Sequence, residues 1–309
     1  MTQARLYACF DFLLSSDIPL PELALADEGD ERPVIPVRLA PLPDSLPEGL
    51  QAGGGLEVAG DEALLTIPKT GRYLVRDGDE ILVDPATNGS ERNLRLFLLG
   101  SALGILCHQR GLLALHANGV VAGNRAFAFA GPSGAGKSSL AAWFAEAGYE
   151  ILGDDVCAIA FGEGGRPCAW PGLPRLKLWG ETLDAFGRDR RFDQAIEGLD
   201  KYHVPLAQRM RARPVPFGRL YILSKAAEGA ETRFRRLRGR DAMDALLAQT
   251  YRGHYLAPLG LGADHFRRCA ALLDHAEVYE VSRTWGYERF AAEAQRIARH
   301  ILSDGADGE

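Results

Sequence analysis

The sequence has few cysteines, no long apolar run and no excess of basic residues. Its five cysteines are scattered, without a Cys-x-x-Cys pair or a Cys/His ligand spacing, which argues against a disulfide framework and a zinc site and favours a reducing, cytoplasmic location. The longest apolar run, 96–107, is shorter than the roughly 20 residues that a membrane-spanning helix needs. No basic segment followed by an apolar stretch opens the chain, so we expect neither a secretory leader nor a membrane partner.

Charge and composition are those of an ordinary globular chain. The formal net charge of −6 gives no electrostatic footprint for nucleic acid or anionic lipid, so neither is an expected partner. Hydrophobic residues make up 47% and charged residues 25% of the 309 positions. This composition allows a sizeable core, and the length favours two domains.

Residues 1–90 are predicted to form a small β-rich N-terminal domain. Prolines and glycines are frequent there and exclude long helices. Short apolar stretches at 63–67, 73–75 and 81–83 are separated by turn sequences that contain glycine and aspartate. This spacing is typical of a hairpin meander.

A second domain is predicted at 91–303, where strands alternate with helices, and 304–309 is expected to be a frayed tail. The alternation indicates an α/β fold. We expect strands at 113–121, 125–130, 149–152 and 220–224, and helices at 91–110, 137–147, 239–251, 263–275 and 286–302.

The glycine-rich loop at 131–138, Gly-Pro-Ser-Gly-Ala-Gly-Lys-Ser, has the Walker A pattern. In this pattern, glycines let backbone N–H groups turn toward phosphate oxygens, a lysine reaches the β and γ phosphates, and a hydroxyl binds Mg²⁺. An apolar strand before the loop and a helix after it strengthen the prediction, because a helix N-terminus also attracts anions. We therefore predict a P-loop domain with ATP and Mg²⁺ as ligands, in which Ser138 binds the metal and the nucleotide is held by Gly131, Ser133, Gly134, Ala135, Gly136, Lys137, Ser138 and Ser139.

Asp154 and Asp155 follow the loop after one helix and one strand. In a layered α/β domain they would end that strand and face the γ-phosphate. One carboxylate is then suited to take a proton from the attacking hydroxyl, while the other holds the metal directly or through water. The alternative is that Gly-Asp-Asp forms a solvated turn. His116, on the strand before the loop, is either a hydrogen-bonded core residue or a neighbour that tunes a carboxylate or a phosphate.

The order and spacing of these motifs over 112–159 resemble the HPr kinase/phosphorylase family, in which a Leu-His segment, a Gly-x-Ser-Gly-x-Gly-Lys-Ser loop and an Asp-Asp pair follow one another. The resemblance implies a catalytic domain related to that of phosphoenolpyruvate carboxykinase, a serine kinase activity that uses ATP, and a homo-oligomer. It also implies that Asp154 is the general base, that Asp155 organises metal or water, and that Lys137 and His116 support the transfer.

A second signature of that family, Glu followed by Arg-Gly-Leu-Gly, is not visible, and 170–179 reads Trp-Pro-Gly-Leu-Pro-Arg-Leu-Lys-Leu-Trp. This departure leaves Glu181 as a weak substitute for the metal-binding glutamate and puts phosphorylase activity in doubt. Short strings at 19–23, 110–116 and 174–179 are similar instead to the HPr kinase-related proteins of lasso-peptide biosynthesis. The acceptor implied by that likeness is the C-terminal serine of a precursor peptide.

Residues outside these motifs are candidates for phosphate or substrate contact. Arg175 and Lys177 alternate on a strand-like stretch, and Lys201 belongs to a segment that either closes over the substrate or is solvated surface. Trp179 and Trp285 are expected to be core or interface anchors. Three functions stay open: a serine kinase for a peptide or small protein, a bifunctional HPr kinase/phosphorylase, and a nucleotide-binding regulatory module without transfer.

Overall fold

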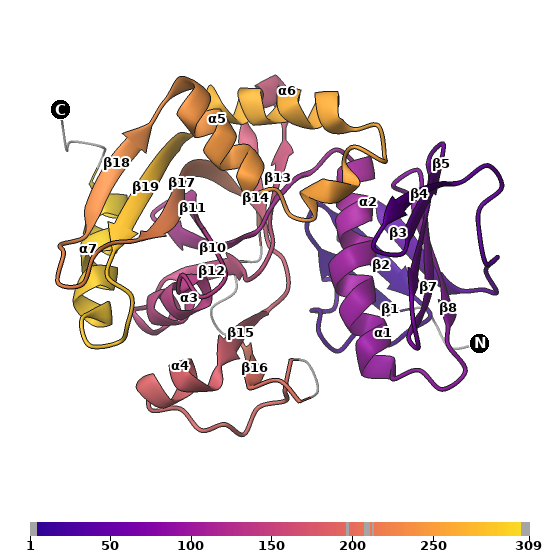
Figure 1. Ribbon diagram of the computed structural model, residues 1–309, viewed down its shortest axis with the longest axis horizontal. Coiled ribbons are helices and arrows are strands. Elements are labelled where there is room, and N and C mark those ends of the chain that lie inside the picture. Colours follow the sequence, from indigo (N-terminus) through magenta and orange to yellow (C-terminus); the bar gives the residue numbers. More distant parts are fainter. Residues whose placement is uncertain (1–4, 196–197, 207–210, 212, 304–309) are drawn as a thin grey trace. The chain divides into compact units, whose positions relative to one another are not determined.

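The computed structural model describes residues 5–195, 198–206, 211 and 213–303. The expected tail at 304–309 lies outside the described residues. Contacts between Cα atoms divide the chain into two compact units, 1–114 with 250–268 and 115–249 with 269–309. This division assigns 91–114 and 250–268 to the first unit, whereas the predicted domains separate at residue 90. Mixed α/β structure, the predicted class, is visible in Figure 1.

The first unit contains an eight-stranded sheet in the order β1-β2-β3-β8-β7-β6-β5-β4. Strands β4 to β8 are connected as an antiparallel meander, as the turn sequences predicted. Strand β3 pairs in parallel with both β2 and β8. The strands are β1 (Arg5–Cys9), β2 (Phe12–Ser16), β3 (Val34–Leu39), β4 (Leu50–Gly53), β5 (Leu56–Ala59), β6 (Glu62–Ile67), β7 (Gly71–Arg76) and β8 (Glu80–Pro85).

A continuous helical segment follows this sheet and confirms the helix predicted at 91–110. It consists of α1 (Glu91–Phe97), a π-helical stretch (Leu98–Ala102) and α2 (Leu103–Gln109). Ser90 is its N-cap and accepts a hydrogen bond from the backbone N–H of Asn93. The Tyr73 hydroxyl of β7 donates to the Leu94 carbonyl at 2.9 Å, so the segment is held on the sheet of its own unit.

The second unit is organised around a nine-stranded sheet whose longest strand is β17 (Val215–Lys225). On one side β17 pairs in parallel with β11, and on the other it pairs in parallel with β19. Near its start it also pairs with β14 in antiparallel fashion. The remaining strands of this sheet are β9 (Leu113–Leu115), β10 (Ala117–Ala122), β11 (Arg125–Ala130), β12 (Glu150–Gly153), β13 (Cys157–Phe161), β14 (Pro167–Trp170), β18 (Arg233–Leu237) and β19 (Glu277–Arg283).

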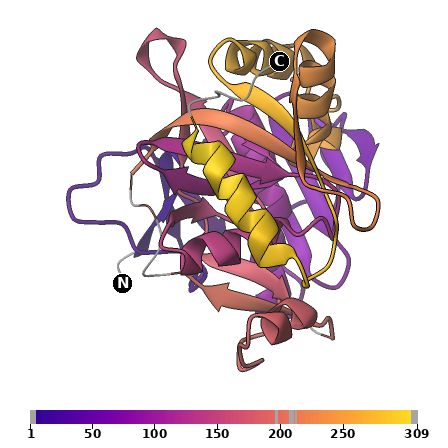
Figure 2. The same cartoon turned by 90° about the vertical axis from the view of Figure 1, so that its left-hand side faces the viewer.

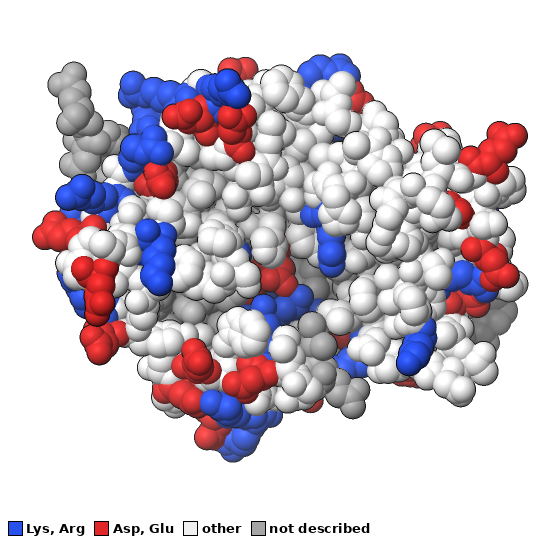
Figure 3. Space-filling view, viewed as in Figure 1, with Lys and Arg blue, Asp and Glu red and all other residues white. Residues whose placement is uncertain are grey.

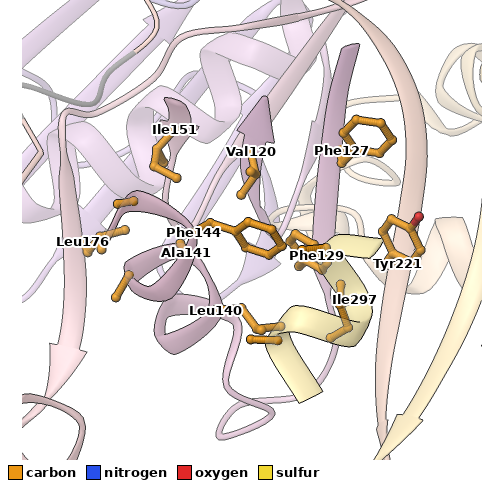
Figure 4. Close-up of a cluster of buried hydrophobic side chains, with 14 of the residues drawn as sticks. Val120, Phe127, Phe129, Leu140, Ala141, Phe144, Ile151, Leu176, Tyr221 and Ile297 are labelled. Carbon is orange, nitrogen blue, oxygen red and sulfur yellow. The ribbon is translucent and has the colours of Figure 1, made fainter. Parts of the chain in front are cut away.

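Helices α3 (Lys137–Glu146) and α7 (Phe290–Leu302) pack on the sheet of this unit, and Figure 2 shows α7 crossing it. Phe129 of β11 stacks on Phe144 of α3 and on Tyr221 of β17, with ring centroids 5.4 Å apart in both pairs. Such pairs contribute about 0.5–1.5 kcal/mol beyond the burial of their area. Figure 4 shows this cluster with Ile297 of α7 beside it. The cluster fixes α3, and therefore the loop that precedes it, relative to the sheet.

Three parallel strands position the site. Because β11, β17 and β19 run in the same direction, their carboxyl ends lie at one edge of the sheet, and the segments after Ala130, Lys225 and Arg283 start from that edge. Ligands of open α/β sheets bind at such an edge. Beside it lies a small module made of β15 (Arg175–Trp179), α4 (Gly180–Ala185) and β16 (Lys201–Pro205).

Other helices complete the described chain: α5 (Gly239–Ala248), α6 (Gly262–Leu273) and short 3₁₀ turns at Glu163–Gly165 and Gly253–Tyr255. None of the helices within the described residues has the length and apolar character required to cross a membrane. Figure 3 shows basic and acidic side chains interspersed over the viewed face.

Candidate phosphate-binding site

The glycine loop lies between β11, which ends at Ala130, and α3, which begins at Lys137, in the strand–loop–helix context that the sequence predicted. Two of its glycines are required by close approach. Gly131 has φ of 140°, and a Cβ there would lie 2.7 Å from the Leu223 carbonyl oxygen. Gly136 has φ of 84°, and a Cβ there would lie 2.3 Å from Nη2 of Arg283. Side chains at these positions would displace the loop from β17 and β19.

Lys137 is the first residue of α3 and lies with its ammonium group inside the loop. Its Nζ donates to the carbonyl of Gly131 at 2.8 Å and to that of Pro132 at 3.2 Å. The Asn118 side-chain amide of β10 donates to the Lys137 carbonyl. Burial lowers the pKa of Lys137, and the two nearby aspartates oppose this change. The Lys137 side chain is therefore held by the carbonyl groups at the start of the loop.

Asp154 follows β12 and is buried beside Ser138. One carboxylate oxygen, Oδ1, accepts a hydrogen bond from the Ser138 hydroxyl at 3.0 Å, and the other accepts from the Lys177 backbone N–H at 2.8 Å. Burial, followed by the charge of Asp155, raises the pKa of Asp154. With 6% of its surface exposed, Asp154 contradicts the alternative that this segment is a solvated turn.

Asp155, the next residue, has a left-handed backbone, with φ of 67°. Its carboxylate binds the Lys177 ammonium at 2.5 Å, and its carbonyl lies 3.1 Å from Nδ1 of His116. Burial would raise the pKa of Asp155, but the positive charges of Lys177 and Lys201 hold it below its ordinary value. The two adjacent carboxylates thus contact different groups of Lys177, its backbone N–H and its ammonium, and their pKa values shift in opposite directions.

A cavity of about 620 Å³ opens over the loop and is lined by residues of the second unit. Most of the predicted site residues meet there. The described residues that line the cavity do not include four of them, Gly131, Ala135, Asp154 and Arg175. The predicted site residues on its wall are His116, Ser133, Gly134, Gly136, Lys137, Ser138, Ser139, Asp155, Lys177 and Lys201.

The positions of Arg175 and Trp179 differ from those expected from the sequence. Arg175 is buried on β15, where its guanidinium lies 3.3 Å from Nδ1 of His203, away from the cavity wall. Trp179 is 42% exposed and lines the cavity, so of the two expected roles, core anchor or interface anchor, the core role is wrong. The register between β15 and β16 pairs Trp179 with Lys201, whose ammonium lies 5.5 Å from the indole ring centroid.

Sequence reasoning missed Arg283, the last residue of β19. Its guanidinium is 3% exposed and donates to the Ala135 carbonyl at 2.8 Å and to the Glu293 carboxylate of α7 at 3.0 Å. Arg283 therefore ties the glycine loop to α7. No local motif surrounds it, and its partner in the glycine loop, Ala135, lies far away in the sequence.

Thr182 and Tyr287 were missed as well and come from separate elements. The Thr182 hydroxyl of α4 lies 3.4 Å from the Ser139 hydroxyl and 2.7 Å from the Tyr287 hydroxyl. All three residues line the cavity. A polar chain thus runs along its wall from the start of α3 to the segment after β19.

The cavity combines positive charge with carboxylate oxygens. Three lysines, the N-terminus of α3 and Arg283 attract a polyanion. The Ser138 hydroxyl and the Asp154 carboxylate are adjacent oxygen donors of the kind that Mg²⁺ takes, and one or two protein oxygens suffice when phosphates supply the others. The donor set thus fits Mg²⁺. Among the described residues, no cluster of three His, Cys, Asp or Glu side chains forms a metal cage.

Comparisons with known proteins give a likeness to solved structures and none to known sequences. The sequence matches no protein-family model and no curated protein. Among solved structures, the Hpr(Ser) kinase/phosphatase from Coxiella burnetii is similar with a TM-score of 0.34 and 13% sequence identity, over 61% of this chain and 96% of that one.

Proposed function

We propose that this protein is an ATP-dependent kinase that transfers the γ-phosphate to a serine hydroxyl of a peptide or small protein. One observation carries the proposal: Lys137 and Ser138 of the glycine loop share one cavity wall with Asp155 and Lys177. A site that only bound nucleotide would have no use for a carboxylate beside the γ-phosphate. The combination of phosphate cradle and carboxylate favours transfer over simple binding.

The loop and the lysines bind and orient the triphosphate. Backbone N–H groups at the start of α3 point toward phosphate oxygens, and Lys137 leaves the Gly131 and Pro132 carbonyls to contact the β and γ phosphates. Lys177 and Lys201 neutralise charge at the far end of the phosphate chain. Positioning and charge stabilisation supply most of the catalysis in phosphoryl transfer.

Ser138 and Asp154 are the residues that would hold Mg²⁺. When bound, Mg²⁺ neutralises phosphate charge in the ground state and in the transition state. Asp154 contributes by accepting the Ser138 hydrogen bond, which keeps the hydroxyl oxygen at the start of α3. The Lys177 N–H fixes the other carboxylate oxygen, so Asp154 cannot rotate away.

Asp155 is the carboxylate that an acceptor hydroxyl in the cavity can reach. In the transfer, the serine oxygen bonds to the γ-phosphorus, the bond to the bridging oxygen of the β-phosphate breaks, and Asp155 takes the hydroxyl proton. Accessibility supports this role for Asp155 over Asp154, which reverses the assignment implied by the family resemblance. Lys177 pairs with Asp155 before substrate binds, and drawing Lys177 toward phosphate raises the basicity of the carboxylate.

The acceptor class follows from the sequence resemblance, and we extend it to the C-terminal serine of a lasso-type precursor peptide. The test is transfer of label from γ-labelled ATP with Mg²⁺ to two acceptors, an HPr-type protein and a peptide that ends in serine. Lys137→Ala serves as the inactive control, because it removes the charge that contacts the γ-phosphate.

Label on the peptide's terminal serine that disappears with Lys137→Ala is the expected result. Label on the HPr-type protein instead would favour the alternative acceptor, and release of that label by inorganic phosphate would make the enzyme bifunctional. ATP binding without transfer to either acceptor would contradict the kinase proposal and favour a nucleotide-binding module.

A further inference from the structure

Two exposed aromatic side chains line the cavity and come from different elements. Trp179 ends β15, whereas Tyr287 lies in the segment between β19 and α7. Each is 42% exposed and lies on the cavity wall, where a bound ligand can contact it. A nucleotide has one flat aromatic group, so the two rings need separate explanations.

The polar chain along the wall distinguishes the two ends of the cavity. Ser138 and Ser139 are successive residues at the start of α3, and their hydroxyls have different partners. Ser138 bonds to Asp154, next to Asp155 and Lys177, which is the end where phosphate is transferred. Ser139 lies beside Thr182, and Thr182 bonds to Tyr287. Tyr287 is therefore connected to the start of α3 through Thr182 and Ser139, and not through the Ser138–Asp154 pair.

The Tyr287 ring is held in place while its face remains accessible. Its hydroxyl is fixed by Thr182 at 2.7 Å, and the ring lies 6.2 Å from that of Phe290 in a tilted arrangement. Trp285, two residues earlier, also lines the cavity and has the Lys225 ammonium 5.5 Å from its ring centroid. An aromatic ring whose orientation is fixed before binding loses little entropy when a base stacks on it.

We propose that Tyr287, flanked by Trp285, is the surface on which the purine of the nucleotide stacks. The proposal rests on the proposed function and adds a nucleoside subsite to the phosphate cradle. Trp179, opposite Lys201 in the β15–β16 register and two residues from Lys177, then belongs to the side on which the acceptor binds. Thr182 is a positioning residue, because it acts on the base only through the Tyr287 hydroxyl.

The test compares binding of two probes, ATP and inorganic tripolyphosphate, to the full chain by calorimetry. Tripolyphosphate has the phosphate chain without the nucleoside. Base–aromatic stacking predicts that Tyr287→Ala weakens ATP binding by about 5- to 150-fold, while tripolyphosphate binding changes less than about twofold. Tyr287→Phe keeps the ring and should bind ATP within about threefold of the wild type. Phe266→Ala, which removes a ring that is 50% exposed and outside the cavity, is the matched control.

Each other outcome overturns the inference. Unchanged ATP affinity in Tyr287→Ala, or equal weakening of both probes, would exclude a stacking role. If only Trp179→Ala weakened ATP binding, the base would stack on Trp179 and not on Tyr287. A wild-type chain that binds neither probe would refute the proposed function itself, whereas wild-type binding of both probes with no effect at Tyr287 would refute only the subsite.

Discussion

Replacing Arg283 should destabilise the second unit strongly, because its partner is a buried carboxylate. Arg283 and Glu293 are 3% and 6% exposed, and their contact is 3.0 Å long. In Arg283→Met the Glu293 carboxylate stays buried without its cation, and breaking one partner of such a pair costs about 3–5 kcal/mol. For a unit of this size, each kcal/mol lowers Tm by about 2–4 °C. We therefore expect a fall of roughly 6–20 °C in a thermal melt.

A second substitution separates stability from loop positioning. Adding Glu293→Leu to Arg283→Met removes the unpaired carboxylate, so Tm should recover most of the loss. The Ala135 carbonyl still lacks the guanidinium that donates to it at 2.8 Å. A hydrogen bond from a charged donor contributes about 1.5–3 kcal/mol. ATP affinity should therefore stay reduced by roughly tenfold or more in the double variant.

Arg296→Met is the matched control, on α7, the helix that also carries Glu293. It removes an exposed ion pair with Glu231, 3.5 Å long, and exposed pairs contribute at most about 1 kcal/mol. Its Tm should change by less than about 4 °C. The reasoning fails if Arg283→Met melts like this control, or if the double variant is as unstable as the single one.

Three further predictions concern the loop and the carboxylates. Asp155→Asn should lower kcat by about 100- to 10,000-fold, while ATP affinity stays within a few-fold of the wild type. Asp154→Asn should instead raise the Mg²⁺ concentration needed for half-maximal rate. The opposite pattern in steady-state kinetics would restore the assignment implied by the resemblance, with Asp154 as the base. Gly136→Ala should weaken ATP binding more than Gly134→Ala, because its added Cβ meets the Arg283 guanidinium. Gly134 has a similar φ but no atom within 4 Å of the added Cβ, so its replacement should cost only about 1–2 kcal/mol of backbone strain. Equal melts and equal affinities would contradict the close contact with Arg283. Removing divalent metal with EDTA should stop transfer but change Tm by less than about 2 °C, because Ser138 and Asp154 already bond to each other. A large fall in Tm would indicate a structural metal.

The sequence predicted those parts of the fold in which local pattern and tertiary structure agree. The helix predicted at 137–147 is α3 (Lys137–Glu146), and the strand at 125–130 is β11. The strand predicted at 113–121 is divided at His116, and the helix predicted at 286–302 begins at Phe290, because the segment after β19 turns along the cavity. Of the β15–α4–β16 module, only the strand-like stretch with Arg175 and Lys177 was foreseen. The module's elements are only five or six residues long, so periodicity gives little signal.

The residues of the candidate site likewise fall into those that a local pattern predicts and those that it does not. Lys137, Ser138 and the aspartates were found because their spacing forms a local motif. Arg283, Thr182 and Tyr287 act through partners on other elements, and single-sequence patterns do not report such pairings. For Arg283, a charged residue at the end of a strand is the only local signal. The difference in burial between Asp154 and Asp155 is not visible in the sequence, where the two carboxylates are equivalent.

The parallel pairing of β17 with β11 and β19 also determines when the site is completed during synthesis. The ribosome makes the glycine loop before β17, which begins only at Val215, and Arg283 and Tyr287 come later still. Long-range parallel pairing is slow, because distant segments must meet before their contacts form. A nascent chain that has reached β17 already contains the whole Walker A sequence but lacks the donor for the Ala135 carbonyl. The proposed nucleotide site is therefore complete only after Arg283 and Tyr287 have been made.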